Sequence, residues 1–149
     1  MFKLISKLQK NIDIRPVKSH EISIRIRYGE TDQMGVVHHG NYALFLEMAR
    51  TEWLRNLGIS YKEMEENGTM LPVVSMSLNY KKSAFYDEVI KVKTQLVKEP
   101  TVKIEFAYEI TNELGELLVT ATTVLAFIDM KTKRPIRAPQ YILEAIAKG

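Results

Sequence analysis

The chain has 149 residues, of which 46% are hydrophobic and 26% are charged, and its formal net charge is +3. This length and composition predict one compact domain around a single hydrophobic core. The chain has no cysteine, which excludes disulfides, thiolate metal ligands and a cysteine nucleophile and fits a cytoplasmic location. No run of about eighteen apolar residues occurs, so no membrane-spanning helix is expected.

The positive charge is concentrated at the start of the chain. Residues 1–20 hold five basic residues and one acidic residue, so they carry +4 and the remainder carries −1. We expect residues 1–18 to form a basic extension and residues 19–149 to form the domain, which is not basic and is not expected to bind nucleic acid. The extension is expected to be solvated or packed on a partner, with weak contact to a membrane surface as the alternative. Four apolar residues fall near one face of a helix in it: Phe2, Ile5, Leu8 and Ile12.

The domain begins with a predicted strand and a predicted helix. Apolar and polar residues alternate over residues 22–27, which is typical of a half-buried strand. Residues 40–57 have a helical pattern that is apolar in almost its whole first half, and Gly58 stands where a glycine commonly ends a helix. A helix that is apolar nearly all round must be wrapped by other structure.

The remainder of the chain predicts mainly strands. After a short amphipathic turn over residues 61–66, three segments alternate apolar and polar residues: 74–81, 90–96 and 102–110. Residues 112–115 predict a hairpin loop. Residues 117–128 are apolar or threonine throughout, which predicts a strand covered on both faces, with a partner subunit over the outer face. Residues 139–148 can close the chain as a short helix.

Between the first strand and the helix, residues 28–42 read Y-G-E-T-D-Q-M-G-V-V-H-H-G-N-Y. Asp32 lies in a turn just before the helix, whose unpaired N–H groups and positive dipole can hold a developing oxyanion. Asp32 itself can act as the base or the nucleophile, so the string predicts acyl transfer to water. Aspartate is also common in turns for structural reasons. A serine hydrolase is not indicated, because the chain has no G-x-S-x-G motif.

Two further carboxylates compete with Asp32 for a role. Glu30 is two residues away, so on an extended chain its side chain would share one side with Asp32 and modulate it, because close carboxylates raise one of their pKa values. Glu47 lies in the apolar half of the helix, where a hydrogen bond or ion pair with Arg50 or Thr51 one turn on is its simplest role.

No metal and no other cofactor is expected. His38 and His39 are adjacent, so their side chains diverge, and no third ligand stands at a metal-binding spacing. Asn41 is most simply a first-turn or capping residue of the helix.

A larger set of residues carries a family resemblance: Tyr28, Glu30, Thr31, Asp32, Gly35, Val36, Val37, His39, Asn41, Tyr42, Glu47, Ala49, Arg50 and Thr51. The pattern resembles the signature of the hotdog-fold acyl-CoA thioesterases, the 4-hydroxybenzoyl-CoA thioesterase family, most closely its YbgC-like branch. The resemblance implies an α+β hotdog fold, in which an antiparallel sheet of about five strands wraps around one long central helix. His38 departs from it, because the family usually carries an aromatic residue there, most often tyrosine.

The resemblance also implies the activity. The chain would hydrolyse a coenzyme A thioester, with Asp32 as general base or nucleophile and the His39 backbone N–H, in the first turn of the helix, polarising the carbonyl. A separate branch of hotdog thioesterases uses a helix carboxylate, which makes Glu47 the second candidate. The alternatives are an acyl-carrier-protein thioesterase and a non-catalytic acyl-CoA-binding or envelope-scaffold module. A hotdog hydratase is disfavoured, because its paired Asp and His motif is absent.

A homodimer or homotetramer that binds acyl-CoA is the assembly that the resemblance implies. The acyl chain would enter the seam between the helix and the partner subunit. Three residues are expected to line the substrate pocket: His38, Asn41 and Tyr42. Three basic residues match positions that bind the phosphates of coenzyme A in the family: Lys103, Arg134 and Arg137.

Overall fold

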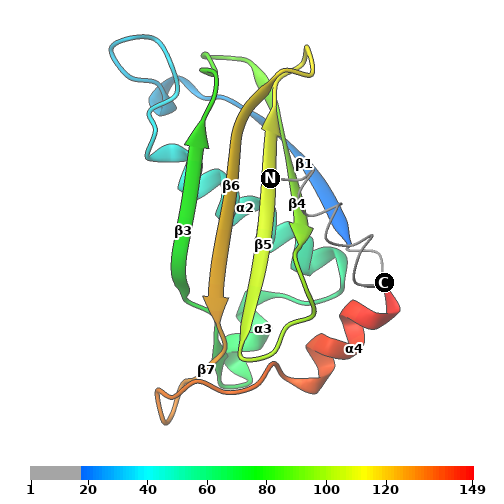
Figure 1. Ribbon diagram of the computed structural model, residues 1–149. Helices are drawn as coiled ribbons and strands as arrows, with labels where there is room; N and C mark the ends of the chain where they lie inside the picture. The colour runs from blue at the N-terminus through cyan, green and yellow to red at the C-terminus, as the bar shows by residue number, and fades with distance from the viewer. Residues whose placement is uncertain (1–17) are drawn as a thin grey trace.

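The structure is a computed structural model that describes residues 18–149 (Figure 1). The basic extension predicted over residues 1–18 therefore lies almost wholly outside the described residues, and so does its predicted contact with a membrane surface. The division of the chain at residue 18 stays a prediction. Within the described residues, no helix is both long enough and apolar enough to cross a bilayer.

The main sheet has five strands, and every neighbouring pair in it is antiparallel. From one edge to the other the strands are β1 (Ser19–Arg25), β4 (Val89–Leu96), β5 (Lys103–Thr111), β6 (Leu117–Ala126) and β3 (Val73–Tyr80). Two short strands, β2 (Thr69–Met70) and β7 (Ile128–Asp129), form a separate pair. The prediction of an antiparallel sheet of about five strands is confirmed.

Three α-helices lie in the described residues: α2 (Asn41–Asn56), α3 (Tyr61–Glu66) and α4 (Gln140–Lys148). The longest, α2, lies behind the sheet in Figure 1 and contacts β1 and β4. It ends as predicted, because Gly58 has a φ of 82° and donates its N–H to the Arg55 carbonyl at 2.8 Å. A left-handed residue at this point stops the helix and satisfies one of its last carbonyl groups.

The hydrophobic core fills the space between α2 and the sheet. The alternation predicted in the strands places Phe106, Tyr108 and Ile110 of β5 on the inner face, where each is completely buried. Trp53 of α2 meets this face, with its ring 5.0 Å from the ring of Phe106. This packing fixes α2 against the sheet and therefore fixes the loop that precedes α2.

The prediction for residues 117–128 needs one correction. The segment is not one strand, because β6 ends at Ala126 and β7 starts at Ile128. On its outer face Thr122 and Val124 are half-buried and no helix of the described residues lies over this face in Figure 1, so its cover by a partner subunit stays a prediction. β6 lies between β5 and β3, so its small outer side chains are screened by neighbouring strands.

Candidate active site

Asp32 closes a tight turn in the loop between β1 and α2. Its Oδ1 atom accepts hydrogen bonds from the N–H groups of Met34, at 2.9 Å, and Val36, at 3.4 Å. Its backbone N–H donates to the Val36 carbonyl at 2.8 Å, and Gly35, with a φ of 79°, completes the turn. Among the described residues, Oδ2 of Asp32 has no hydrogen-bond partner. One carboxylate oxygen therefore builds the turn, while the other is available for chemistry.

The turn between this loop and α2 leaves one backbone N–H without an acceptor. The His38 N–H donates to the Glu30 carbonyl at 2.9 Å, and the Gly40 N–H donates to Nδ1 of His38 at 3.1 Å. The next two N–H groups, of Asn41 and Tyr42, donate to the carbonyls of His38 and His39 at 3.0 and 3.3 Å. Within residues 18–149 the His39 N–H has no such partner, so it can receive an external oxygen.

The placement of His39 differs slightly from the expectation. The cap of α2 is Gly40, so His39 precedes the cap instead of lying in the first helical turn. No sequence pattern indicates the residue that holds His39, which is Tyr80 at the end of β3. The Tyr80 hydroxyl donates to the His39 carbonyl at 3.2 Å, and the ring of Tyr80 lies 5.6 Å from that of Tyr42.

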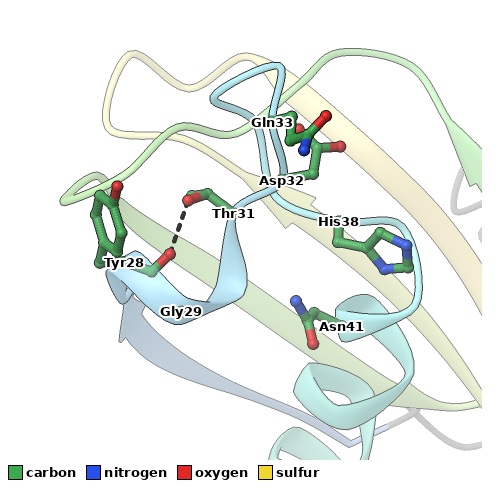
Figure 2. Close-up of a pocket in the computed structure, with 7 residues that line it drawn as sticks. All are labelled: Tyr28, Gly29, Thr31, Asp32, Gln33, His38 and Asn41. Carbon is green, nitrogen blue, oxygen red and sulfur yellow. Dashed lines mark hydrogen bonds between the residues drawn. The ribbon is translucent and has the colours of Figure 1, made fainter.

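A pocket of 640 Å³ opens beside this turn (Figure 2). It is lined by Tyr28, Gly29, Thr31, Asp32, Gln33, His38 and Asn41. The pocket thus brings together three predicted site residues, Asp32, His38 and Asn41. Tyr42 is not in this lining, because it is buried beneath the turn against Phe45. Sequence analysis did not find the contribution of Gln33, since nothing in a loop sequence shows which side chains share one cavity.

Glu30 takes part in the site through its backbone. Residues Tyr28–Glu30 form a 3-10 turn, so the extended chain assumed for Glu30 is wrong. Its carboxylate instead accepts from the backbone N–H of Arg27 at 2.6 Å and pairs with the Arg27 guanidinium at 3.2 Å. Its carbonyl accepts hydrogen bonds from the His38 N–H at 2.9 Å and from Nδ2 of Asn41 at 2.8 Å. Glu30 therefore ties the loop to the start of α2.

Glu47 lies apart from the pocket. It is eight residues after His39, about 12 Å further along the helix axis, and its side chain is 65% exposed. Its Oε2 atom lies 4.0 Å from Nη2 of Arg50, so the predicted pair is present but long. The structure thus separates the two catalytic candidates in space.

The three basic residues predicted to bind coenzyme A lie at the opposite end of the sheet from Asp32. Tyr80, which contacts His39, pairs with Val119, whereas Lys103 pairs with Ala126 at the other end of β6. β3 has eight residues, so these ends are about 23 Å apart. Arg134 and Arg137 follow β7, whose label lies at the lower end of the molecule in Figure 1, and the Arg134 carbonyl accepts the N–H of Asp129 in β7 at 2.9 Å. A single subunit does not bring these residues to the pocket.

Sequence comparison places this chain among enzymes that cleave thioesters. A model of the thioesterase-like superfamily matches residues 26–146, so the chain belongs to this superfamily. The crystal structure of DHNA-CoA thioesterase from Staphylococcus aureus is 44% identical, with a TM-score of 0.82, and the match covers 87% of this chain and 89% of that one. The hotdog fold and the class of thioester hydrolase predicted from the sequence are thereby confirmed.

Two further relatives support this assignment. YneP of Bacillus subtilis is 39% identical over 114 residues, which cover 76% of this chain and 83% of YneP. The acyl-CoA thioesterase YbgC of Haemophilus influenzae is 31% identical over 123 residues, which cover 82% of this chain and 90% of YbgC. The resemblance to the YbgC-like branch is therefore confirmed.

Proposed function

We propose that this protein hydrolyses acyl-CoA thioesters to a free acid and coenzyme A. One observation carries the proposal: Asp32, which lines the pocket, has a carboxylate oxygen without a partner in the described residues, and His39, whose neighbour His38 lines the same pocket, has a backbone N–H without one. The first can activate water or attack carbon, and the second can bind a carbonyl oxygen. The names of the relatives in Staphylococcus aureus and Haemophilus influenzae support the choice of a coenzyme A thioester.

The chemistry follows from these two groups. As a general base, Asp32 takes a proton from water while the water oxygen attacks the thioester carbon. As a nucleophile, it would form a mixed anhydride that water then cleaves. In either case the carbonyl oxygen gains negative charge, which the His39 N–H and the positive end of the α2 dipole stabilise. The C–S bond then breaks, and coenzyme A leaves as a thiolate that takes up a proton.

The test is release of free thiol from a panel of acyl-CoAs by the wild type and by Asp32→Asn. Removing a positioned base or nucleophile should lower kcat by about 10²–10⁴ while the variant stays folded. Glu47→Gln is the matched control, because it removes the second candidate carboxylate, which lies on α2 apart from the pocket. Near-normal turnover by Asp32→Asn together with loss of turnover in Glu47→Gln would assign the chemistry to Glu47.

The same assay separates the alternative functions. An acyl-carrier-protein thioesterase would release thiol faster from the acylated carrier protein than from the matching acyl-CoA. A non-catalytic acyl-CoA-binding or scaffold module would bind acyl-CoA without releasing thiol. The free Oδ2 atom of Asp32 favours hydrolysis over such a module.

We also propose that two copies of the chain pair along β3. This strand is at the edge of the sheet, and exposed apolar side chains gather there, among them Val74 at 52%, Met76 at 42% and Tyr80 at 50% exposure. On α2, Leu44 is 57% exposed and Met48 is 49% exposed. An edge strand with an apolar rim is prone to pair with another strand, and two-fold pairing is the commonest way to cover such a surface.

Antiparallel pairing of β3 with its copy would complete the site. The pairing would set the start of one β3 beside the end of the other, which is next to Tyr80 and the pocket. The end of the partner subunit's sheet that holds the basic residues would then face the pocket. These residues are Lys103, Arg134 and Arg137. Positive charge at this place suits the phosphates of coenzyme A. A site shared in this way accounts for the distance between these residues and Asp32 within one subunit.

Two earlier expectations remain predictions. They are the contact of the basic extension with an anionic membrane surface and the cytoplasmic location.

A further inference from the structure

The peptide group between His39 and Gly40 is held at both of its ends by side chains. Its N–H, from Gly40, donates to Nδ1 of His38 at 3.1 Å. Its carbonyl, from His39, accepts the Tyr80 hydroxyl at 3.2 Å. Because a peptide group is planar, these two contacts fix its orientation and hence the backbone angle on the C-terminal side of His39.

The neighbouring peptide group, which carries the His39 N–H, is held on one side only. Its carbonyl, from His38, accepts the Asn41 N–H at 3.0 Å, while its own N–H has no acceptor within the described chain. His38 therefore decides how many donors the turn presents. With its Nδ1 atom in place the Gly40 N–H is used, and without it that N–H would have no acceptor and its peptide group would be held at the carbonyl end only.

The ring of His38 fits closely over Gly40. A Cβ atom at residue 40 would lie 3.2 Å from Nδ1 of His38 and 3.3 Å from Cε1, which is tighter than ordinary contact. The ring of His39 lies against that of His38, with centroids 4.3 Å apart, so the divergence of these two side chains expected from the sequence is wrong. The position of the His38 ring is thus set by packing on two sides as well as by its hydrogen bond.

We propose that His38 and Tyr80 are positioning residues that reserve and aim the His39 N–H as the single backbone donor to the substrate carbonyl. This inference rests on the proposed function, because it concerns the donor assigned there. Tyr80 adds a second consequence, since it belongs to the edge strand β3. The donor's geometry is thereby connected to the strand along which we propose that the subunits pair.

Two substitutions of His38 test the role of its hydrogen-bond acceptor independently of the role of its ring. His38→Asn keeps an acceptor at the δ position, which can reach the N–H two residues on, but it loses the ring. His38→Phe keeps a ring but has no acceptor. We expect His38→Phe to lower kcat about five- to tenfold, as loss of one hydrogen bond predicts, and His38→Asn to restore most of this loss.

Tyr80→Phe tests the other end of the peptide group. It removes only the hydroxyl, and it should also lower kcat while leaving KM unchanged. Tyr141→Phe is the control, because it removes a hydroxyl from a half-exposed tyrosine on α4. A fall in kcat of the same size in Tyr141→Phe, or none in Tyr80→Phe, would overturn the role of Tyr80.

An NMR measurement of amide hydrogen exchange gives a readout that does not need activity. In the wild type and in His38→Asn the Gly40 N–H should exchange slowly, and in His38→Phe it should exchange much faster. If His38→Phe keeps the wild-type kcat, or if His38→Asn loses as much as His38→Phe, the acceptor has no positioning role and the inference is overturned. If the wild type releases no thiol, the proposed hydrolysis is wrong. Independently of activity, an unchanged exchange rate of the Gly40 N–H in His38→Phe would show that His38 does not hold this N–H, and it would overturn the inference.

Discussion

Asp32 combines a structural and a chemical role in one side chain. Its Oδ1 atom holds the turn through the Met34 N–H, which is the ordinary behaviour of aspartate in a turn. That hydrogen bond also orients the carboxylate, so that the Oδ2 atom stays at the pocket without having to be held by the substrate. Pre-orientation of this kind removes an entropic cost from the reaction. The structural role therefore supports the catalytic role instead of competing with it.

Tyr108 illustrates how the core affects a single ionisable group. Burial raises the pKa of Tyr108 to about 12 from its ordinary 10.0, and its hydrogen bond with Thr123 and the nearby Arg50 offset only part of this rise. The two hydroxyl oxygens, of Tyr108 and Thr123, are 2.6 Å apart. The ionised form of Tyr108 is thus disfavoured in the folded protein.

This raised pKa predicts a loss of stability at alkaline pH. Between about pH 10 and pH 12 the unfolded chain releases the Tyr108 proton while the folded chain keeps it, so the free energy of unfolding falls as the pH rises. The contribution is complete below pH 10, and its loss amounts to about 3 kcal/mol. Urea unfolding across this range should show a smaller decline in Tyr108→Phe than in the wild type. An equal decline in the two proteins would contradict the assignment.

Among the elements, α2 carries an unusual buried charge. Arg50 is only 5% exposed, and its Nε and Nη1 atoms have no hydrogen-bond partner in the described residues. Its guanidinium interacts with the hydroxyl groups of Tyr61 and Tyr108, by its charge and by hydrogen bonding, and so partly offsets the burial that raises the pKa of both tyrosines. Its ion-pair partner Glu47 is exposed and 4.0 Å away, which makes the pair weak. A buried cation with incomplete hydrogen bonding destabilises the folded state.

Replacing this charge should therefore stabilise the protein. We expect Arg50→Met, which keeps much of the side-chain volume, to raise the free energy of unfolding by about 1 kcal/mol. Because Glu47 is exposed, the variant leaves no carboxylate buried. Arg50→Lys is the control, since it keeps the charge and should bring no gain. Thermal or urea unfolding measures the effect, and a clear loss of stability in Arg50→Met would mean that the guanidinium has stabilising partners in solution.

At the scale of the whole molecule, the positions of β3 and of the basic residues predict a shared active site. If two chains pair along β3, each site combines Asp32 of one chain with Arg134 and Arg137 of the other. The mass in solution should then be at least twice the 17.2 kDa of one chain. Light scattering at micromolar concentration measures this, and a species of one chain alone would exclude the shared site.

A mixing experiment tests the sharing directly. Asp32→Asn alone should be inactive, and a chain with both Arg134→Glu and Arg137→Glu should have a raised KM for acyl-CoA. In a mixed dimer of the two, one site carries all the substitutions and the other carries none, so activity should reappear. The mixed dimers are formed by unfolding the two variants together and refolding them. Asp32→Asn unfolded and refolded by itself is the control. If the mixture is no more active than its components, the basic residues act on the pocket of their own chain or not at all.

The sequence by itself determined the order of the elements and the turn that carries Asp32. Alternation with a period of two and the helical pattern of residues 40–57 are local signals, since they depend on which face of a short segment is buried. The glycine at residue 58 and the Asp32 turn are local in the same sense, because each needs only a few neighbouring residues. For this reason the strand segments and the position of α2 in the chain were predictable from local patterns, whereas the antiparallel pairing of about five strands was implied by the family resemblance.

Only the tertiary structure decided which side chains meet at the turn before α2. Tyr80 lies 41 residues from His39 in the chain, and its hydrogen bond exists because β3 ends beside that turn. Glu30 was misjudged because its carboxylate is held by Arg27 in a 3-10 turn that the alternating pattern does not reveal. The distance between Asp32 and Arg134 depends on the register of strands far apart in sequence. Such contacts depend on how complete elements pack, and no short stretch of sequence records that packing.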